Sequence, residues 1–161
     1  MHKYAVFYWK YNAFVIQLII YIFLDGDKMT RKQEREKAFC LIFEKSFKED
    51  TCEEILELAE SLSEFELTEH IKLLFIGVFE NIEFIDGIIS KHLKNWTINR
   101  VSKTDLSLMR LAVYEMEFCD DIPENVTINE FVELAKIYCG EKGPSYINGV
   151  LGSISRSGEL A

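Results

Sequence analysis

The chain has 161 residues, of which 48% are hydrophobic and 28% are charged, and its formal net charge is −9. This composition suits one compact domain, or two small helical halves sharing an interface, because the apolar surface is large enough to offset chain entropy. The net negative charge argues against a protein that coats nucleic acid or an anionic membrane without specificity, so any contact with RNA requires a local basic patch.

The first 28 residues differ in composition from the rest. Residues 4–24 contain a single charge, Lys10, and are dense in aromatic and β-branched side chains. A membrane anchor or secretory signal is one interpretation, but the apolar run 13–24 is short for a span and no small-residue cleavage site follows it. Because Thr30 and a basic helix directly follow Met29, a start codon assigned too early is the simpler interpretation. We therefore expect residues 1–28 to lie outside the native fold of a cytoplasmic protein.

From Thr30 onward the apolar spacing is helical, and no later segment alternates as a strand would. Capping boxes of Thr30 with Gln33 and of Thr51 with Glu54 predict two helix starts. Apolar side chains three and four residues apart predict a further helix over 67–82 and a short one over 85–96.

The last third of the chain predicts three more helices. Ser102 marks the start of one, Thr127 with Glu130 forms a capping box for the next, and Gly143-Pro144 begins the last. The pattern therefore predicts an all-α fold, a compact bundle of about seven helices in two helical halves over residues 29–161.

Residue types that catalyse reactions or hold metals are not grouped in known motifs. The three histidines lack Cys, Asp or Glu neighbours at metal-ligand spacing, and there is no phosphate-binding glycine loop, serine elbow or dinucleotide fingerprint. The four cysteines form no close pair, so reduced thiols are expected. We therefore predict no catalytic residue, no metal ligand and no cofactor.

A basic cluster opens the first predicted helix: it consists of Arg31, Lys32, Arg35 and Lys37. Arg31 and Arg35 are four residues apart, so their guanidinium groups share a helix face and can meet successive phosphates of one strand. The side chains of Arg31, Lys32 and Arg35 are expected to face solvent. Cations at a helix N-terminus interact unfavourably with the helix macrodipole, which hints that the cluster serves a purpose other than helix stability. The alternative is an ordinary solvent-exposed helix whose cations form ion pairs with the neighbouring acids Glu34 and Glu36.

Three blocks of the last third, taken in order, resemble the NusB family. They are residues 105–115, 126–136 and 146–151, and the basic cluster matches the arginine-rich first helix of that family. The resemblance covers residues 29–156. It implies a NusB-like helical fold and a noncatalytic factor of transcription antitermination.

The resemblance also implies a surface that binds the boxA sequence of nascent RNA. Its basic positions match Arg31, Lys32 and Arg35, and its aromatic positions match Tyr138 and Tyr146. Lys142, in the loop between the two tyrosines, partly compensates for a basic patch that is thinner than in some family members. Single-stranded RNA is held by stacking bases on such rings while cations follow the backbone. Each tyrosine is equally compatible with a place in the core.

A protein partner follows from the same resemblance. Family members bind NusE, a small-subunit ribosomal protein, through a surface that includes the start of the fifth helix, and Lys103 and Asp105 match that region. With NusE the protein would recognise boxA-type RNA and help the RNA polymerase elongation complex through ribosomal RNA operons. A helical accessory domain related to that of RNA cytosine methyltransferases and a pure protein adaptor are the alternatives. The sequence leaves open whether the protein is a monomer or a homodimer.

Overall fold

The computed structural model describes residues 29–62 and 67–160, and the regular secondary structure within these ranges is helical. The elements are α3 (Arg31–Lys45), α4 (Cys52–Leu62), α5 (Glu69–Glu80), α6 (Ile82–His92), the short 3-10 helix η1 (Ile98–Arg100), α7 (Lys103–Phe118), α8 (Glu124–Tyr138) and α9 (Gly143–Ser157). The prediction of an all-α fold with about seven helices is confirmed.

The N-terminal extension and the apolar stretch within residues 4–24 lie outside the described residues. Within residues 29–62 and 67–160, none of the helices combines the length and the apolar character needed to cross a bilayer.

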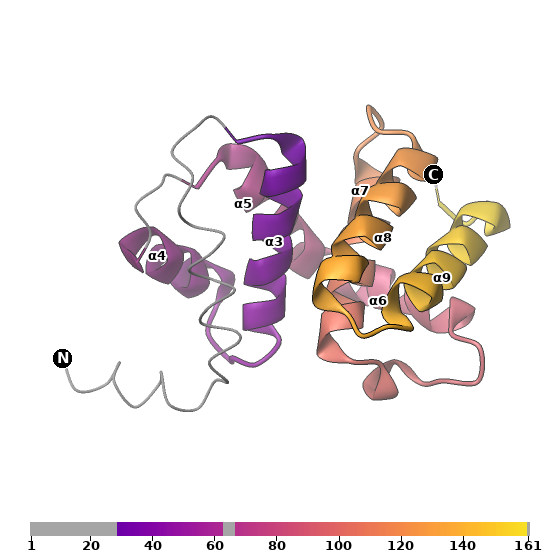
Figure 1. Cartoon of the computed structure of the whole chain (residues 1–161). Coiled ribbons are helices and arrows are strands. Elements are labelled where there is room, and N and C mark those ends of the chain that lie inside the picture. The colour runs from indigo at the N-terminus through magenta and orange to yellow at the C-terminus, as the bar shows by residue number, and fades with distance from the viewer. Residues whose placement is uncertain (1–28, 63–66, 161) are drawn as a thin grey trace.

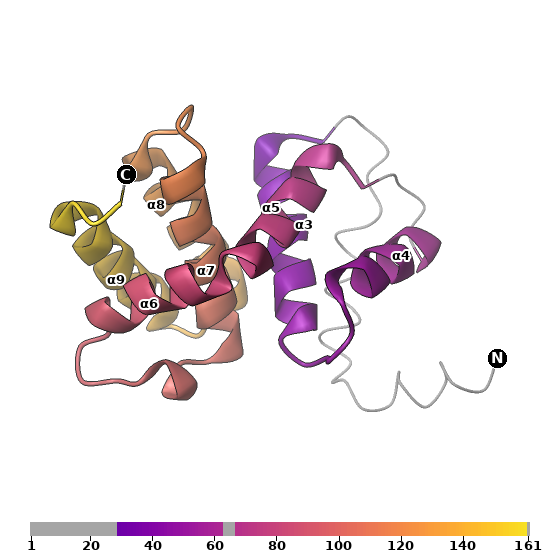
Figure 2. The ribbon, with the colours of Figure 1, turned by 180° about the vertical axis from the view of Figure 1, so that it is seen from behind.

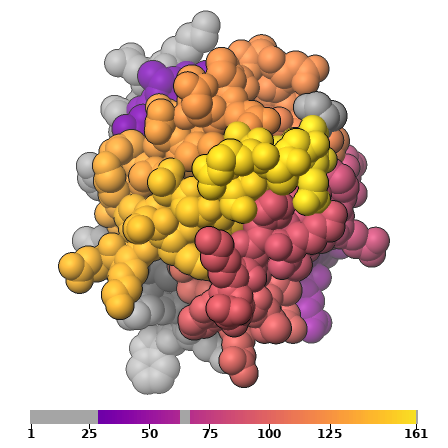
Figure 3. All heavy atoms as spheres, turned by 90° about the vertical axis from the view of Figure 1, so that its right-hand side faces the viewer, coloured from indigo at the N-terminus to yellow at the C-terminus, as the bar shows by residue number. Residues whose placement is uncertain are grey.

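The helices divide into two halves that lie side by side (Figure 1). The first half contains α3, α4 and α5, and the second contains α6, α7, α8 and α9. Helices α3 and α5 both pack on α7, which is the central element of the second half. On the outer face of that half, α9 lies between α8 and α6 (Figure 3). Helix α3 is therefore held by contacts with the other half as well as its own.

Local signals account for most of the helix starts. The Thr30 side chain accepts from the Gln33 backbone N–H, and the Gln33 side chain accepts from the Thr30 backbone N–H at 2.8 Å. Thr51 and Glu54 make the same reciprocal pair at 2.7 and 3.2 Å. Two of the three predicted capping boxes, those of Thr30 and Thr51, are therefore confirmed.

Two predicted helix ends are wrong. The capping box of Thr127 does not form, because α8 begins three residues earlier at Glu124, where Pro123 supplies a fixed φ that suits a helix start. Helix α6 ends at His92 instead of continuing to Trp96, because Leu93 is extended and Asn95 adopts a φ of 61°. Trp96 is 57% exposed, so no buried apolar stripe continues the helix there.

The two halves approach closely where α5 packs on α7. A Cβ atom added to Gly77 of α5 would lie 2.2 Å from the hydroxyl oxygen of Tyr114 on α7. Asn81 alone separates α5 from α6, so α5 continues into α6 across the joint (Figure 2). Glycine at position 77 therefore sets the distance between the halves.

Replacing Gly77 with alanine is expected to lower the free energy of unfolding by about 1–3 kcal/mol, because the new methyl group would overlap the buried Tyr114 ring. The matched control is Gly87→Ala on α6, where nothing lies within 4 Å of the added Cβ. That change should stabilise the protein by up to about 1 kcal/mol through helix propensity. Urea denaturation measures both values, and stabilisation of the same size by the two variants would contradict the close approach.

Candidate nucleic-acid interface

Arg31 and Lys32 lie on the exposed face of the first turn of α3, as expected. The Arg31 side chain is 62% exposed and donates to Glu34 at 3.2 Å. Its partner Glu34 is buried and also accepts from the Thr68 hydroxyl at 2.7 Å, so Arg31 is the exposed half of a part-buried ion pair. Both cations present exposed side chains to an external anion, and Arg31 does so while it is paired with Glu34.

Arg35 does not share this solvent-exposed face, so the expectation that it faces solvent is wrong. Its side chain is only 7% exposed, and its Nε donates to Oε2 of Glu115 at 2.6 Å. Its Nη1 lies 3.6 Å from Oε2 of Glu130. The reason is tertiary, because α3 packs on α7 and the partner carboxylate is 80 residues away in the sequence.

The Glu115 carboxylate is fully buried and both of its oxygens are used. Oε2 accepts from Arg35, and Oε1 accepts from the Thr127 hydroxyl on α8 at 2.7 Å. We call Arg35, Glu115, Thr127 and Glu130 the buried charge network. It joins α3, α7 and α8 at one place.

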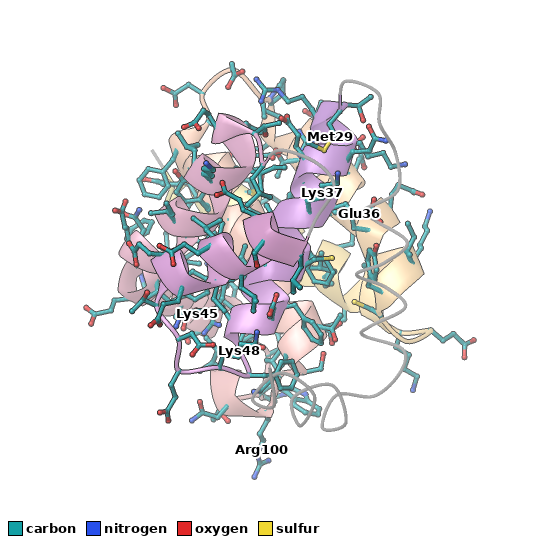
Figure 4. All side chains as sticks on the ribbon, turned by 90° about the vertical axis from the view of Figure 1, so that its left-hand side faces the viewer. Met29, Glu36, Lys37, Lys45, Lys48 and Arg100 are labelled. Atoms are coloured by element: carbon teal, nitrogen blue, oxygen red, sulfur yellow. The ribbon has the colours of Figure 1, made fainter. Side chains whose placement is uncertain are left out.

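Tyr138 lies at the seam between α3 and α8. Its ring centroid is 4.9 Å from that of Phe39, and its hydroxyl donates to the Glu36 carboxylate. Figure 4 shows Glu36 with Met29 and Lys37 toward the start of α3, and Lys45 and Lys48 at its far end. Tyr138 is of intermediate exposure as a residue, and its contact with Glu36 lies one to two turns from the exposed cations.

Tyr146, in the first turn of α9, lies in a different environment. Its hydroxyl is buried, with no hydrogen-bond partner in the described part of the chain. Burial and the negative charge of Asp105 raise the pKa of this phenol. The carboxylate of Asp105 also raises the pKa of Cys139 through a hydrogen bond, adding to the larger effect of burial. One predicted RNA-binding residue and one predicted partner-binding residue therefore lie close together.

The two predicted partner-binding residues point to different neighbours. The Lys103 Nζ lies 3.9 Å from the ring centroid of Phe47 and donates to the carbonyl of Ser46 at the end of α3. Asp105 faces the turn between α8 and α9, where its Oδ1 would lie 3.4 Å from a Cβ added to Gly143. Lys142 lies exposed on the same turn.

The two tyrosines differ in a way that Tyr→Phe variants should reveal. Tyr146→Phe is expected to leave the free energy of unfolding unchanged or raise it by up to about 1 kcal/mol, because it removes a buried hydroxyl without a partner. Tyr138→Phe is expected to lower it by about 1 kcal/mol, because it removes the hydrogen bond to Glu36. Thermal and urea unfolding measure both changes. A clear loss of stability in Tyr146→Phe would contradict the unpaired hydroxyl.

The buried charge network was missed from the sequence, although one signal was present. Glu115 interrupts an otherwise apolar run, residues 111–116, on the most buried helix. An acid on an inward helix face requires a buried partner, and that requirement indicates a distant cation. Within residues 29–62 and 67–160, no group of three His, Cys, Asp or Glu side chains is placed to hold a metal ion.

Comparison with known proteins gives one consistent result. The model of the NusB family matches residues 32–156. The transcription antitermination protein NusB of Clostridium botulinum is 41% identical over 140 residues, covering 78% of this chain and 99% of its own length. That of Acetivibrio thermocellus is 45% identical over 130 residues, covering 78% of this chain and 88% of the relative.

Two solved structures have the same fold. The structure of T. maritima NusB aligns with a TM-score of 0.73 and 35% identity, covering 81% of this chain and 93% of that one. A crystal structure of the antitermination factors NusB and NusE in complex with double-stranded RNA aligns with a TM-score of 0.69 and 27% identity, covering 80% of this chain and 99% of that one.

Proposed function

The chain belongs to the NusB family, and from this membership we propose that it is a noncatalytic transcription antitermination factor. It binds boxA-type RNA together with NusE, and the complex helps the RNA polymerase elongation complex to transcribe ribosomal RNA operons. A cytoplasmic location is part of this proposal.

The observation that carries the proposal is the exposed basic start of α3 beside a half-buried aromatic ring. Arg31 and Lys32 face solvent on a protein of net charge −9, and Tyr138 lies at the neighbouring α3–α8 seam. On an acidic body, two exposed cations make a local site for phosphates without general attraction to nucleic acid. An accessible ring edge or face adds base stacking.

Single-stranded RNA is the form that suits this surface. The solved relative complex contains double-stranded RNA, and duplex RNA is recognised through its shape and through phosphates over an extended surface. Here the exposed cations are few and the aromatic side chains Tyr138 and Tyr146 are the other contributors. Rings and a short basic stretch are typical of single-strand recognition. Lys142, exposed on the α8–α9 turn near Asp105 and Tyr146, is a further cation for this proposal.

NusE docks at the start of α7 in this proposal. Lys103 already packs on the end of α3, and Asp105 faces the α8–α9 turn near Tyr146. A partner bound at Asp105 would therefore lie close to an RNA-binding side chain. This proximity supports joint recognition of RNA by the two proteins.

The test is a titration of the full chain with labelled RNA, with and without NusE, at two salt concentrations. The probes are a boxA-type single strand, its scrambled sequence and a boxA duplex. We expect the boxA strand to bind with NusE at least about tenfold more tightly than the scrambled strand, and more weakly at high salt. Equal binding of the two strands would overturn the proposal. Binding of NusE without any RNA affinity would indicate the adaptor function.

A further inference from the structure

Arg35 belongs to the basic cluster by sequence but to the interior by structure. We propose that Arg35 is a positioning residue: through the buried charge network it fixes α3 against α7 and α8, and so holds Arg31, Lys32 and Tyr138 in one RNA-binding surface without contacting RNA itself. This inference rests on the proposed function, because it assigns a role within the same site.

Burial argues against a phosphate contact by Arg35. Its guanidinium is enclosed, and its Nε is 2.6 Å from a fully buried carboxylate. Turning Arg35 outward to a phosphate would leave Glu115 charged, buried and unpaired. Such a stranded charge is strongly unfavourable, whereas the Arg31 side chain already reaches solvent in the folded protein, and its partner Glu34 also accepts from the Thr68 hydroxyl.

The network closes a triangle of helices. Arg35 joins α3 to α7 through Glu115, and Glu115 joins α7 to α8 through Thr127. Arg35 also approaches Glu130, which lies two turns before Tyr138 on α8. Each of the three helix pairs, α3–α7, α7–α8 and α3–α8, is thus joined by a charged or buried polar contact with a defined direction.

The RNA-binding side chains sit directly on this triangle. Arg31 and Lys32 lie one turn before Arg35 on α3, and the next residue, Glu36, accepts the hydroxyl of Tyr138. A rotation of α3 about its axis would therefore move the cations and the tyrosine relative to each other. Arg35 fixes that rotation, and with it the spacing between phosphate and base contacts.

Two variants separate positioning from phosphate contact. Glu115→Gln keeps Arg35 and the shape of the side chain but removes the charge that orients the guanidinium. Arg35→Met/Glu115→Gln removes both charges and leaves an amide oxygen to accept from Thr127. Glu130 is 34% exposed, so it stays solvated in the double variant. Arg31→Ala is the matched control for a true phosphate contact.

RNA affinity is measured for the full chain with NusE over a salt series, using the boxA-type single strand, together with the thermal transition. We expect Glu115→Gln to bind about tenfold more weakly with an unchanged salt slope. We expect the double variant to recover most of the affinity, also with an unchanged slope. Arg31→Ala should instead flatten the slope by about 0.7.

The proposal is overturned if Glu115→Gln binds as tightly as the wild-type protein or more tightly, because a released Arg35 would then be serving the RNA. It is also overturned if the double variant folds but its slope is flatter by about 0.7. Absence of any boxA binding by the wild-type protein would overturn the proposed function, and the role of Arg35 with it. If instead the wild-type protein binds boxA and Glu115→Gln binds equally well, only the role of Arg35 is overturned and the proposed function stands.

Discussion

Replacing Glu115 with alanine is expected to lower the free energy of unfolding by about 3–5 kcal/mol. The change leaves the Arg35 guanidinium buried without its carboxylate, and it also removes the acceptor of the Thr127 hydroxyl. A buried charge that loses its partner costs more than the pair contributed, because the remaining ion has no solvent to replace the lost contact. Urea denaturation followed by circular dichroism measures the loss.

The matched control is Glu57→Ala, an exposed acid in the middle of α4. It changes the net charge equally but should alter the free energy of unfolding by less than about 0.5 kcal/mol. If Glu115→Ala were as mild as this control, the buried charge network would contribute nothing to stability.

Removing Arg31 and Lys32 together should have the largest effect on RNA binding. With a slope near −0.7 for each phosphate contact on a single strand, the double alanine variant is expected to flatten the plot of log affinity against log salt by about 1.4 units. Helix content and the thermal transition should remain, because both side chains are exposed and alanine favours helices. Binding to NusE should also survive, since Lys103 and Asp105 lie on another helix.

A control for net charge is the pair Lys94→Ala and Arg100→Ala, two exposed cations in the second half. This pair removes the same total charge, but the salt slope should stay as in the wild-type protein. An unchanged slope and affinity after removal of Arg31 and Lys32 would show that this face is merely solvated and that RNA docks elsewhere.

Helix identity could be predicted because it depends on neighbours in the sequence. The capping boxes at Thr30 and Thr51 satisfy backbone groups within three residues, so their pattern alone is sufficient. The same pattern misled at Thr127, whose hydroxyl is taken by Glu115 inside the protein. A hydroxyl suits a helix cap and a buried acceptor equally well, and only the packed structure decides between them.

The candidate site was predictable only where exposure followed from the first helical turn. Arg31 and Lys32 precede the contact of α3 with the second half, and they face solvent as expected. Arg35 lies one turn further on, where α7 covers α3, and its partner is 80 residues away. Spacing along one helix cannot reveal which of its faces another helix will cover.

The distance in sequence between Arg35 and Glu115 also has a consequence for synthesis on the ribosome. The chain emerges from its N-terminus, so α3, α4 and α5 are complete before α7 exists. Until residue 115 is added, the Arg35 guanidinium stays hydrated. The first half then also lacks α7, the helix on which α3 and α5 pack. A nascent chain that ends after α5 should therefore resist proteases poorly, and protection should arise in a single step once α7 and α8 have left the exit tunnel.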